Sequence, residues 1–166
     1  GVVSGTGQGL FEPDKSLTRA ELARMLVLAL GLKPDPAAEL AFTDAAAIPD
    51  WASPFVAAAQ KSGLLRGYPD GSFQAGRTLT RAELITTVVR AAPAVQNAAA
   101  GDLDLLAAFA DQSAIPEWAR PAAEQAAALG LVGPFWGEEF RADSPARRAD
   151  AAAVLRRLID LTRDNS

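Results

Sequence analysis

The 166-residue sequence contains no cysteine and no histidine. Without cysteine the chain can form no disulfide, no thiolate metal site and no cysteine nucleophile. Without histidine it lacks the commonest general base and the commonest metal ligand. We therefore expect neither a metal ion nor another cofactor.

Long hydrophobic runs are also absent. No apolar run approaches the roughly 20 residues of a membrane helix, so we expect no membrane insertion. The net charge of −4 argues against broad binding to nucleic acid, because such binding needs a basic face. It leaves room for an anionic ligand held by a few placed arginines. The start at Gly1 shows neither a signal peptide nor an initiator methionine, which indicates a piece of a longer protein.

What the sequence does contain is an internal repeat. Residues 17–22, Leu-Thr-Arg-Ala-Glu-Leu, recur 62 positions later as residues 79–84. A degraded form, Ala-Arg-Arg-Ala-Asp-Ala, occupies residues 146–151, another 67 positions along the chain. Phe11, Phe73 and Phe140 recur at the same two spacings. One recurring peptide can arise by chance, but several residues that share both spacings indicate a repeat protein.

The repeated segment predicts the start of a helix. Thr18 with Glu21, and Thr80 with Glu83, have the spacing of a capping box, in which the threonine hydroxyl and the glutamate carboxylate each accept a backbone N–H group. We expect helices over residues 18–30 and 80–92, each with an apolar stripe that faces the core.

The third copy departs from this pattern, because Arg147 stands at the threonine position and cannot cap a helix. Ser144 followed by Pro145 is a better start, with serine as the N-cap and proline in the first turn. We therefore predict that the last helix begins about three residues earlier than its counterparts and ends near residue 162.

A second motif precedes the repeated segment in the second and third copies. Residues 42–44, Phe-Thr-Asp, recur as Phe-Ala-Asp at 109–111, and Trp51-Ala52 recurs as Trp118-Ala119. In the second copy we expect a helix from the tryptophan to about residue 62. Trp51 is expected to be partly buried, and it can contact a ligand at the same time, because tryptophan often packs its ring while one edge stays in water.

The loop that follows this helix is rich in glycine and turn residues in the second copy, at residues 66–73. A phosphate-binding loop is the sharper alternative, but the Gly-Lys-Ser/Thr ending of a P-loop is absent. The loop of the third copy, residues 133–140, gains two aromatics and two carboxylates, namely Phe135, Trp136, Glu138 and Glu139.

Helix capping does not explain the arginine inside the repeated segment. A capping box leaves this position free, and a positive charge at a helix N-terminus is slightly unfavourable. Arg19 and Arg81 are either solvated surface charges or contacts to an anion. Free N–H groups at a helix N-terminus, beside a guanidinium, would suit a carboxylate or a phosphate.

Together, these motifs resemble the S-layer homology domain, which usually occurs as three tandem copies that attach bacterial surface proteins to cell-wall polysaccharide. The resemblance is carried by Phe-x-Asp, the tryptophan-alanine pair, Gly-x-x-Asp-Gly-x-Phe in residues 67–73, and Thr-Arg-Ala-Glu. It implies an all-α fold in which three prongs surround a central helical bundle with pseudo-threefold symmetry. The copies are expected at residues 1–32, 42–92 and 109–162 of one co-operative domain, the first without its leading helix.

The resemblance also implies a function and a site. The family binds an anionic secondary cell-wall polysaccharide, commonly with ketal-linked pyruvate on an N-acetylated hexosamine, in grooves between copies. It implies secretion and a location at the cell surface, in the cell wall or an S-layer, with neighbouring surface-protein domains as further partners. We expect one groove between Arg19 and the Trp51 helix, and a second between Arg81 and the Trp118 helix. The implied ligand contacts are Arg19, Arg81, Arg148, Gly5, Gly67, Trp51, Trp118, Lys61 and Arg66.

Two other functions are alternatives. The chain could be a protein-docking or S-layer self-assembly repeat without glycan binding, in which Phe135, Trp136 and the alanine-rich helices form an exposed apolar patch. It could also be a carbohydrate-active enzyme with paired carboxylates, such as Asp44 with Asp50 or Glu138 with Glu139. These acids have simpler roles as turn and cap residues, so we expect no enzymatic activity.

Overall fold

The structure, a computed structural model, describes residues 12–37, 39–91 and 104–164, so Gly5 and Phe11 lie outside it. Over these residues it contains α-helices and short 3-10 helices (η) but no strand, which confirms the all-α fold. None of the described helices is long and apolar enough to cross a membrane. The α-helices are α1 (Arg19–Ala29), α2 (Ser53–Lys61), α3 (Arg81–Arg90), α4 (Arg120–Ala128) and α5 (Arg148–Asp164). The 3-10 helices are η1 (Ala45–Ala47), η3 (Leu105–Ala108), η4 (Gln112–Ala114) and η5 (Pro134–Trp136).

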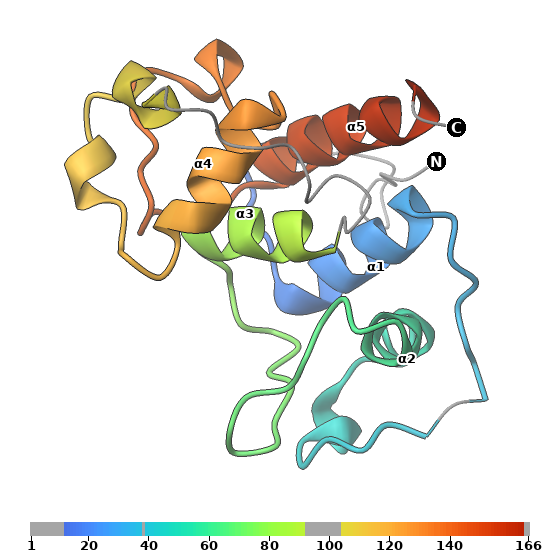
Figure 1. Ribbon diagram of the computed structural model, residues 1–166. Helices are drawn as coiled ribbons and strands as arrows, with labels where there is room; N and C mark the ends of the chain where they lie inside the picture. Colours follow the sequence, from blue (N-terminus) through green and yellow to red (C-terminus); the bar gives the residue numbers. More distant parts are fainter. Residues whose placement is uncertain (1–11, 38, 92–103, 165–166) are drawn as a thin grey trace.

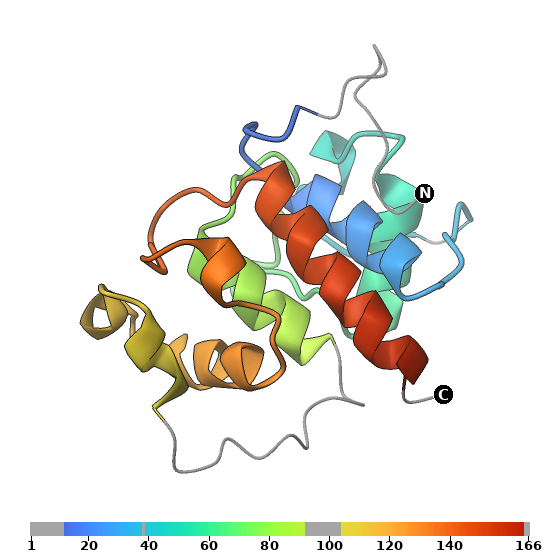
Figure 2. The same cartoon turned by 90° about the horizontal axis from the view of Figure 1, so that it is seen from above.

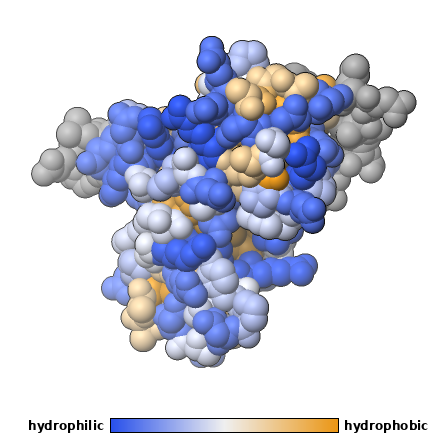
Figure 3. All heavy atoms as spheres, turned by 90° about the vertical axis from the view of Figure 1, so that its left-hand side faces the viewer, coloured by the Kyte–Doolittle hydropathy of each residue, from blue (hydrophilic) through white to orange (hydrophobic). Residues whose placement is uncertain are grey.

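The three helices that begin with the repeated arginine lie together at the centre of the molecule (Figures 1 and 2). Helix α5 packs against both α1 and α3, while α2 packs against α1 and α4 packs against α3. Each outer helix therefore packs on the central helix of the preceding copy. On the face shown in Figure 3, hydrophobic residues form separate small patches within a mostly hydrophilic surface.

A closed ring of backbone hydrogen bonds joins the three copies just before the central helices. The N–H of Leu17 donates to the carbonyl of Ala146 (2.8 Å), that of Ala146 to Leu79 (2.8 Å) and that of Leu79 to Leu17 (3.0 Å). These residues occupy equivalent positions in the three copies, and all are buried. The ring links the copies in a cycle; the pseudo-threefold symmetry of the whole assembly stays a prediction.

Two further sets of bonds join the same copies, with donors and acceptors running around the cycle in the opposite direction. The first N–H of each central helix donates to a loop carbonyl of another copy, and so does the second. The first set joins Arg19 to Arg77 (3.0 Å), Arg81 to Ser144 (2.9 Å) and Arg148 to Lys15 (2.9 Å). The second set joins Ala20 to Ala75 (3.1 Å), Ala82 to Ala142 (3.0 Å) and Ala149 to Pro13 (3.0 Å).

Both predicted capping boxes are present at the starts of α1 and α3. The hydroxyl of Thr18 accepts from the N–H of Glu21 (3.3 Å), whose carboxylate accepts from the N–H of Thr18 (2.9 Å). Thr80 and Glu83 make the same pair of bonds, at 3.2 and 2.9 Å. Capping and the bonds between copies together satisfy the N–H groups of the first turn, which a helix cannot satisfy itself.

The predicted start of the last helix was wrong, because α5 begins at Arg148, the position equivalent to the starts of α1 and α3. Ser144 does not cap it. The carbonyl of Ser144 accepts the N–H of Arg81, and Pro145 forms a bridge with Thr80. These contacts between copies hold the segment extended, and they outweigh the local preference of serine and proline for a helix start. The carboxylate of Asp150 supplies part of the missing cap by accepting the N–H of Arg147 (2.8 Å).

The aspartate of the Phe-x-Asp motif fixes the loop that leads into the next central helix. The carboxylate of Asp44 accepts the N–H groups of Phe73 (2.7 Å) and Gln74 (2.8 Å). Asp111 does the same for Phe140 (2.6 Å) and Arg141 (2.8 Å). These bonds hold Gln74 and Arg141 at positive φ (56° and 53°) and bury the two phenylalanines in the core. The hydrogen bond from Phe73 is the largest cause that lowers the pKa of Asp44 below its usual value.

We expect Asp44→Asn to lower the free energy of unfolding by about 1–2 kcal/mol, because the amide loses the charge and places an NH2 group near a backbone donor. A lowered carboxyl pKa adds stability above about pH 4, and this contribution is lost as the pH falls through the folded value. The difference between wild type and variant should therefore be largest near neutral pH and shrink in acid, as measured by urea unfolding at several pH values. Asp50→Asn, at an exposed position, is the matched control and should change little; equal effects of both variants would contradict the assigned role.

The corrected helix start gives a second test. Thr80→Ala should lower the free energy of unfolding by about 1 kcal/mol, because it removes the acceptor of a capping bond. Ser144→Ala should change it by less than about 0.5 kcal/mol, because only the backbone of Ser144 is used. Thermal or urea unfolding of the two variants measures the contrast, and a large loss with Ser144→Ala would restore serine as the cap.

Candidate functional site

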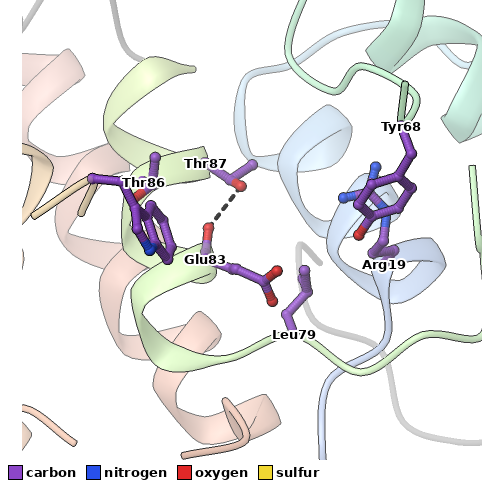
Figure 4. Close-up of a pocket in the computed structure, with 7 residues that line it drawn as sticks. Arg19, Tyr68, Leu79, Glu83, Thr86 and Thr87 are labelled. Atoms are coloured by element: carbon purple, nitrogen blue, oxygen red, sulfur yellow. Dashed lines mark hydrogen bonds between the residues drawn. The ribbon is translucent and has the colours of Figure 1, made fainter. Parts of the chain in front are cut away.

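A pocket of about 120 Å³ lies where all three copies meet. Arg19 comes from the start of α1 in the first copy, and Trp118 comes from the turn before α4 in the third. The second copy supplies the loop residue Tyr68 and the side chains of α3 and of the segment before it. Arg19 and Tyr68 lie on one side of the pocket, and Thr86 and Thr87 lie on the other (Figure 4). The full lining is Arg19, Tyr68, Leu79, Glu83, Thr86, Thr87 and Trp118.

Arg19 is a buried side chain that is tied to the loop of the second copy. Its Nε donates to the carbonyl of Phe73 (2.8 Å) and its Nη2 to the carbonyl of Arg66 (2.9 Å). The guanidinium carbon lies 4.6 Å from the ring centre of Tyr68 and 4.9 Å from that of Phe73. Burial is the main cause that lowers the pKa of Arg19 below its usual value. No described residue accepts a hydrogen bond from Nη1, so this group can serve a ligand.

The equivalent arginines are buried as well, with other partners. The guanidinium of Arg81 lies 3.9 Å from the ring centre of Trp136 and donates to that residue's carbonyl (3.1 Å). Its Nη1 lies 3.9 Å from a carboxylate oxygen of Asp150. Arg148 pairs with Glu21 at 3.1 Å. Only 8%, 9% and 6% of Arg19, Arg81 and Arg148 is exposed, so the alternative of solvated surface charges was wrong.

The expectation of free N–H groups beside the arginine was also wrong. In α1 the N–H groups of Arg19 and Ala20 donate to carbonyls of the second copy, and that of Glu21 donates to the Thr18 hydroxyl. The sequence predicted the bond to Thr18 but could not show the other two, because the acceptors of Arg19 and Ala20 lie more than fifty residues away along the chain. An anion near Arg19 therefore has to be held by side chains and not by the helix N-terminus.

The two repeated tryptophans are both exposed, by 47% for Trp51 and 57% for Trp118. Trp118 shares the pocket with Arg19, whereas the sequence suggested Trp51 as its partner. The pairing differs because the third copy's α4 packs on α3, whose N-terminal end lies beside Arg19. The outer helices pack on the expected central helices, α2 on α1 and α4 on α3, but the side chain of Arg19 lies in a pocket with the tryptophan of the third copy.

Three other expected contacts have structural partners in the described part of the chain. Lys61 lies 3.7 Å from Asp35 and does not line the pocket. The side chain of Arg66 is exposed, and its carbonyl is what reaches Arg19. At Gly67 a Cβ atom would lie 3.0 Å from the ring of Phe42, so packing already requires glycine there.

Sequence reasoning missed Tyr68, Thr86 and Thr87 as pocket residues. Thr87 donates to the carbonyl of Glu83 (2.7 Å), which is visible as the dashed line in Figure 4. The hydroxyl of Thr86 is buried and has no partner among the described residues. The one available signal was that Tyr68 is the only tyrosine of the chain.

The apolar patch expected for a docking surface does not form. Trp136 is 7% exposed, because it lies under Arg81. Phe135 is exposed, but the guanidinium of Arg157 lies 3.9 Å from its ring centre. Of the paired carboxylates, that of Asp44 is used by backbone N–H groups and that of Glu139 pairs with Arg141 at 2.9 Å. The described residues include no cluster of acids that could hold a metal ion.

Because Arg19 supports the fold, its removal should affect stability as well as any binding. We expect Arg19→Ala to lower the free energy of unfolding by about 2–4 kcal/mol, since two backbone carbonyls lose a charged donor. Arg66→Ala is the matched control: its backbone acceptor remains, so the change should be below about 0.5 kcal/mol. Urea unfolding measures both, and an unchanged stability of Arg19→Ala would show that these bonds contribute nothing.

Comparison with known proteins gives a consistent assignment. The family model of the S-layer homology domain matches residues 1–23, 41–85 and 108–152. A surface layer protein of Brevibacillus choshinensis is 41% identical over 96 residues, which is 55% of this chain and 8% of that protein. An amylopullulanase of Thermoanaerobacterium thermosulfurigenes is 30% identical over 160 residues, which is 96% of this chain and 8% of the enzyme. Cell surface glycoprotein 1 of Acetivibrio thermocellus is 27% identical over 162 residues, or 94% of this chain and 7% of that protein.

The chain thus spans less than a tenth of each of these relatives. Since the family model covers most of its length, the chain belongs to the S-layer homology domain family and is a secreted module that anchors a protein at the cell surface.

Proposed function

We propose that the pocket between the three copies binds an acidic substituent of a secondary cell-wall polysaccharide, and that the chain attaches its parent protein to the wall without catalysis. The observation that carries this proposal is the combination of a buried guanidinium with an exposed tryptophan in one pocket, at Arg19 and Trp118. The acidic substituent that fits best is a ketal-linked pyruvate on an N-acetylated hexosamine.

The chemistry of the pocket suits such a ligand. Nη1 of Arg19 is a donor without a described partner, and a carboxylate is an acceptor. A charge-assisted hydrogen bond contributes about 1.5–3 kcal/mol, or roughly 10- to 150-fold in Kd. The exposed ring of Trp118 offers an apolar surface to the sugar face, as aromatic side chains do when one side stays in water.

The other two arginines are less suited to a ligand of this chain. Arg81 is covered by the ring of Trp136, which belongs to the loop that differs most from the second copy. Arg148 is paired with Glu21. We therefore assign the glycan to the Arg19 pocket and a structural role to Arg81 and Arg148.

The relatives support anchoring more than catalysis. Proteins named for surface layers or cell walls, from Brevibacillus and Bacillus, match this chain, and so do enzymes such as the amylopullulanase and the exoglucanase XynX of Acetivibrio thermocellus. A segment shared by proteins with such different names, and amounting to 8% and 14% of the two enzymes, fits a common attachment module. We propose wall polysaccharide as the partner, with neighbouring surface-protein domains in the parent protein.

The proposal predicts that Trp118→Ala weakens binding of a pyruvylated N-acetylhexosamine glycoside about tenfold or more, as loss of a central aromatic contact commonly does. Stability should change little, because the side chain is exposed. Isothermal titration calorimetry gives the affinity, and circular dichroism checks the fold.

Trp51→Ala is the matched control, since Trp51 holds the equivalent position and does not line the pocket. It should bind the glycoside like the wild type. The same glycoside without its ketal should bind neither protein tightly. A wild-type chain that binds both glycosides equally, or a loss of binding with Trp51→Ala alone, would contradict the assignment.

A further inference from the structure

Arg77 contacts two walls of the pocket without being among the residues that line it. Its Nη1 donates to the hydroxyl of Tyr68 (2.6 Å), and its Nη2 lies 2.8 Å from a carboxylate oxygen of Glu83. Tyr68 and Glu83 both line the pocket. One exposed side chain therefore holds together a loop residue and a helix residue on which the pocket depends.

The ring of Tyr68 lies near two guanidinium groups. That of Arg19 is 4.6 Å from the ring centre and that of Arg77 is 5.4 Å away. Such contacts with the face of an aromatic ring are favourable, and the hydrogen bond to the hydroxyl fixes the ring's orientation. The position of Arg19 against Tyr68 is thus coupled to Arg77.

Glu83 presents an electrostatic problem for an anionic ligand. Its carboxylate points toward the side of the pocket where Arg19 lies (Figure 4). It cannot turn away without loss, because its other oxygen caps α3 by accepting the N–H of Thr80 (2.9 Å). A negative ligand beside Arg19 would meet this negative charge, and like charges brought together at a binding site are costly.

Arg77 offsets that charge directly. The hydrogen bond with Glu83 is the main cause that raises the pKa of Arg77. The pKa of Arg19 is lowered, mainly by burial, and the charge of Glu83 opposes only part of that effect. With Glu83 paired to Arg77, the positive charge of Arg19 remains available to the pocket. A pair that is partly exposed, like this one, contributes little to stability, so its effect on the pocket can be measured separately.

The arrangement is specific to the second copy. The positions equivalent to Arg77 are Lys15 and Ser144. Lys15 lies 3.9 Å from Glu21, whose same oxygen is 3.1 Å from Arg148. In the first copy Glu21 therefore pairs with a buried arginine, Arg148 of the third copy. In the second copy the equivalent acid, Glu83, pairs with the exposed Arg77 instead.

We propose that Arg77 is the positioning residue that makes this pocket selective for acidic over neutral glycans, by neutralising Glu83 and by fixing Tyr68 against Arg19. The inference rests on the proposed function, since it concerns the same pocket. It adds a role that the repeated motif does not contain, because Arg77 stands before the motif and differs between the copies.

The test is a double-mutant cycle with Arg77→Gln and Glu83→Gln. Glutamine at position 83 can still cap the helix, and glutamine at position 77 removes the charge while keeping an N–H donor on a shorter side chain. The probes are a methyl glycoside of 4,6-pyruvylated N-acetylhexosamine and its methyl ester, which has nearly the same shape without the charge. We expect Arg77→Gln to weaken binding of the acid about tenfold and to leave binding of the ester within about twofold.

The double variant should recover most of the affinity for the acid, because the charge that Arg77 offsets is gone. Glu83→Gln alone should bind the acid at least as tightly as the wild type, and Arg77→Lys should resemble the wild type. The defect of Arg77→Gln should shrink as salt is raised, since ions screen the exposed repulsion.

Several outcomes separate this inference from the proposed function. If the wild type does not distinguish the acid from the ester, the proposed function fails. If it does, but the double variant is as weak as Arg77→Gln, then Arg77 does not act through Glu83 and the inference is overturned. The inference also fails if Arg77→Gln loses the ester as strongly as the acid, or if Glu83→Gln weakens binding of the acid. Binding of the acid by Glu83→Gln tests the inference even if Arg77→Gln does not fold.

Discussion

The structure depends on the backbone hydrogen bonds that join the three copies at the starts of α1, α3 and α5. The ring through Leu17, Leu79 and Ala146 is buried, and buried backbone groups have to find partners. No copy contains those partners itself. Each therefore needs the next one to complete its helix start, which explains why the repeated segment is placed at the contact between copies and why one repeat alone would leave these groups unpaired.

This constraint also determines what the repeated arginine can do. Since the N–H groups of the first turn are already bonded, the backbone of the helix end offers nothing to a ligand, and the guanidinium of the repeated arginine has to make any contact. In Arg19 two of the three guanidinium nitrogens hold the loop of the second copy, which leaves the third for the pocket. Folding and binding therefore use different atoms of one side chain, and an arginine variant alone cannot separate the two.

The parts that the sequence predicted are those in which cause and effect lie close along the chain. Thr18 and Glu21 are three residues apart, and their capping box forms as expected. The errors arose where distant residues decide. Ser144 has the local features of a helix start but lies in the contact with the second copy, and Trp118 reaches Arg19 only because α4 packs on α3. Neither contact can be inferred from the spacing of the motifs.

The differences between the copies show how one scaffold supports unequal sites. At equivalent positions, Arg19 has the ring of Tyr68 beside an open pocket, Arg81 has the ring of Trp136 over it, and Arg148 has Glu21 as its partner. The backbone bonds that join the copies are the same in all three, so these exchanges of side chains leave the helix starts intact. Because the scaffold tolerates them, a copy can lose a ligand site and still be required, since its neighbours depend on its carbonyl groups.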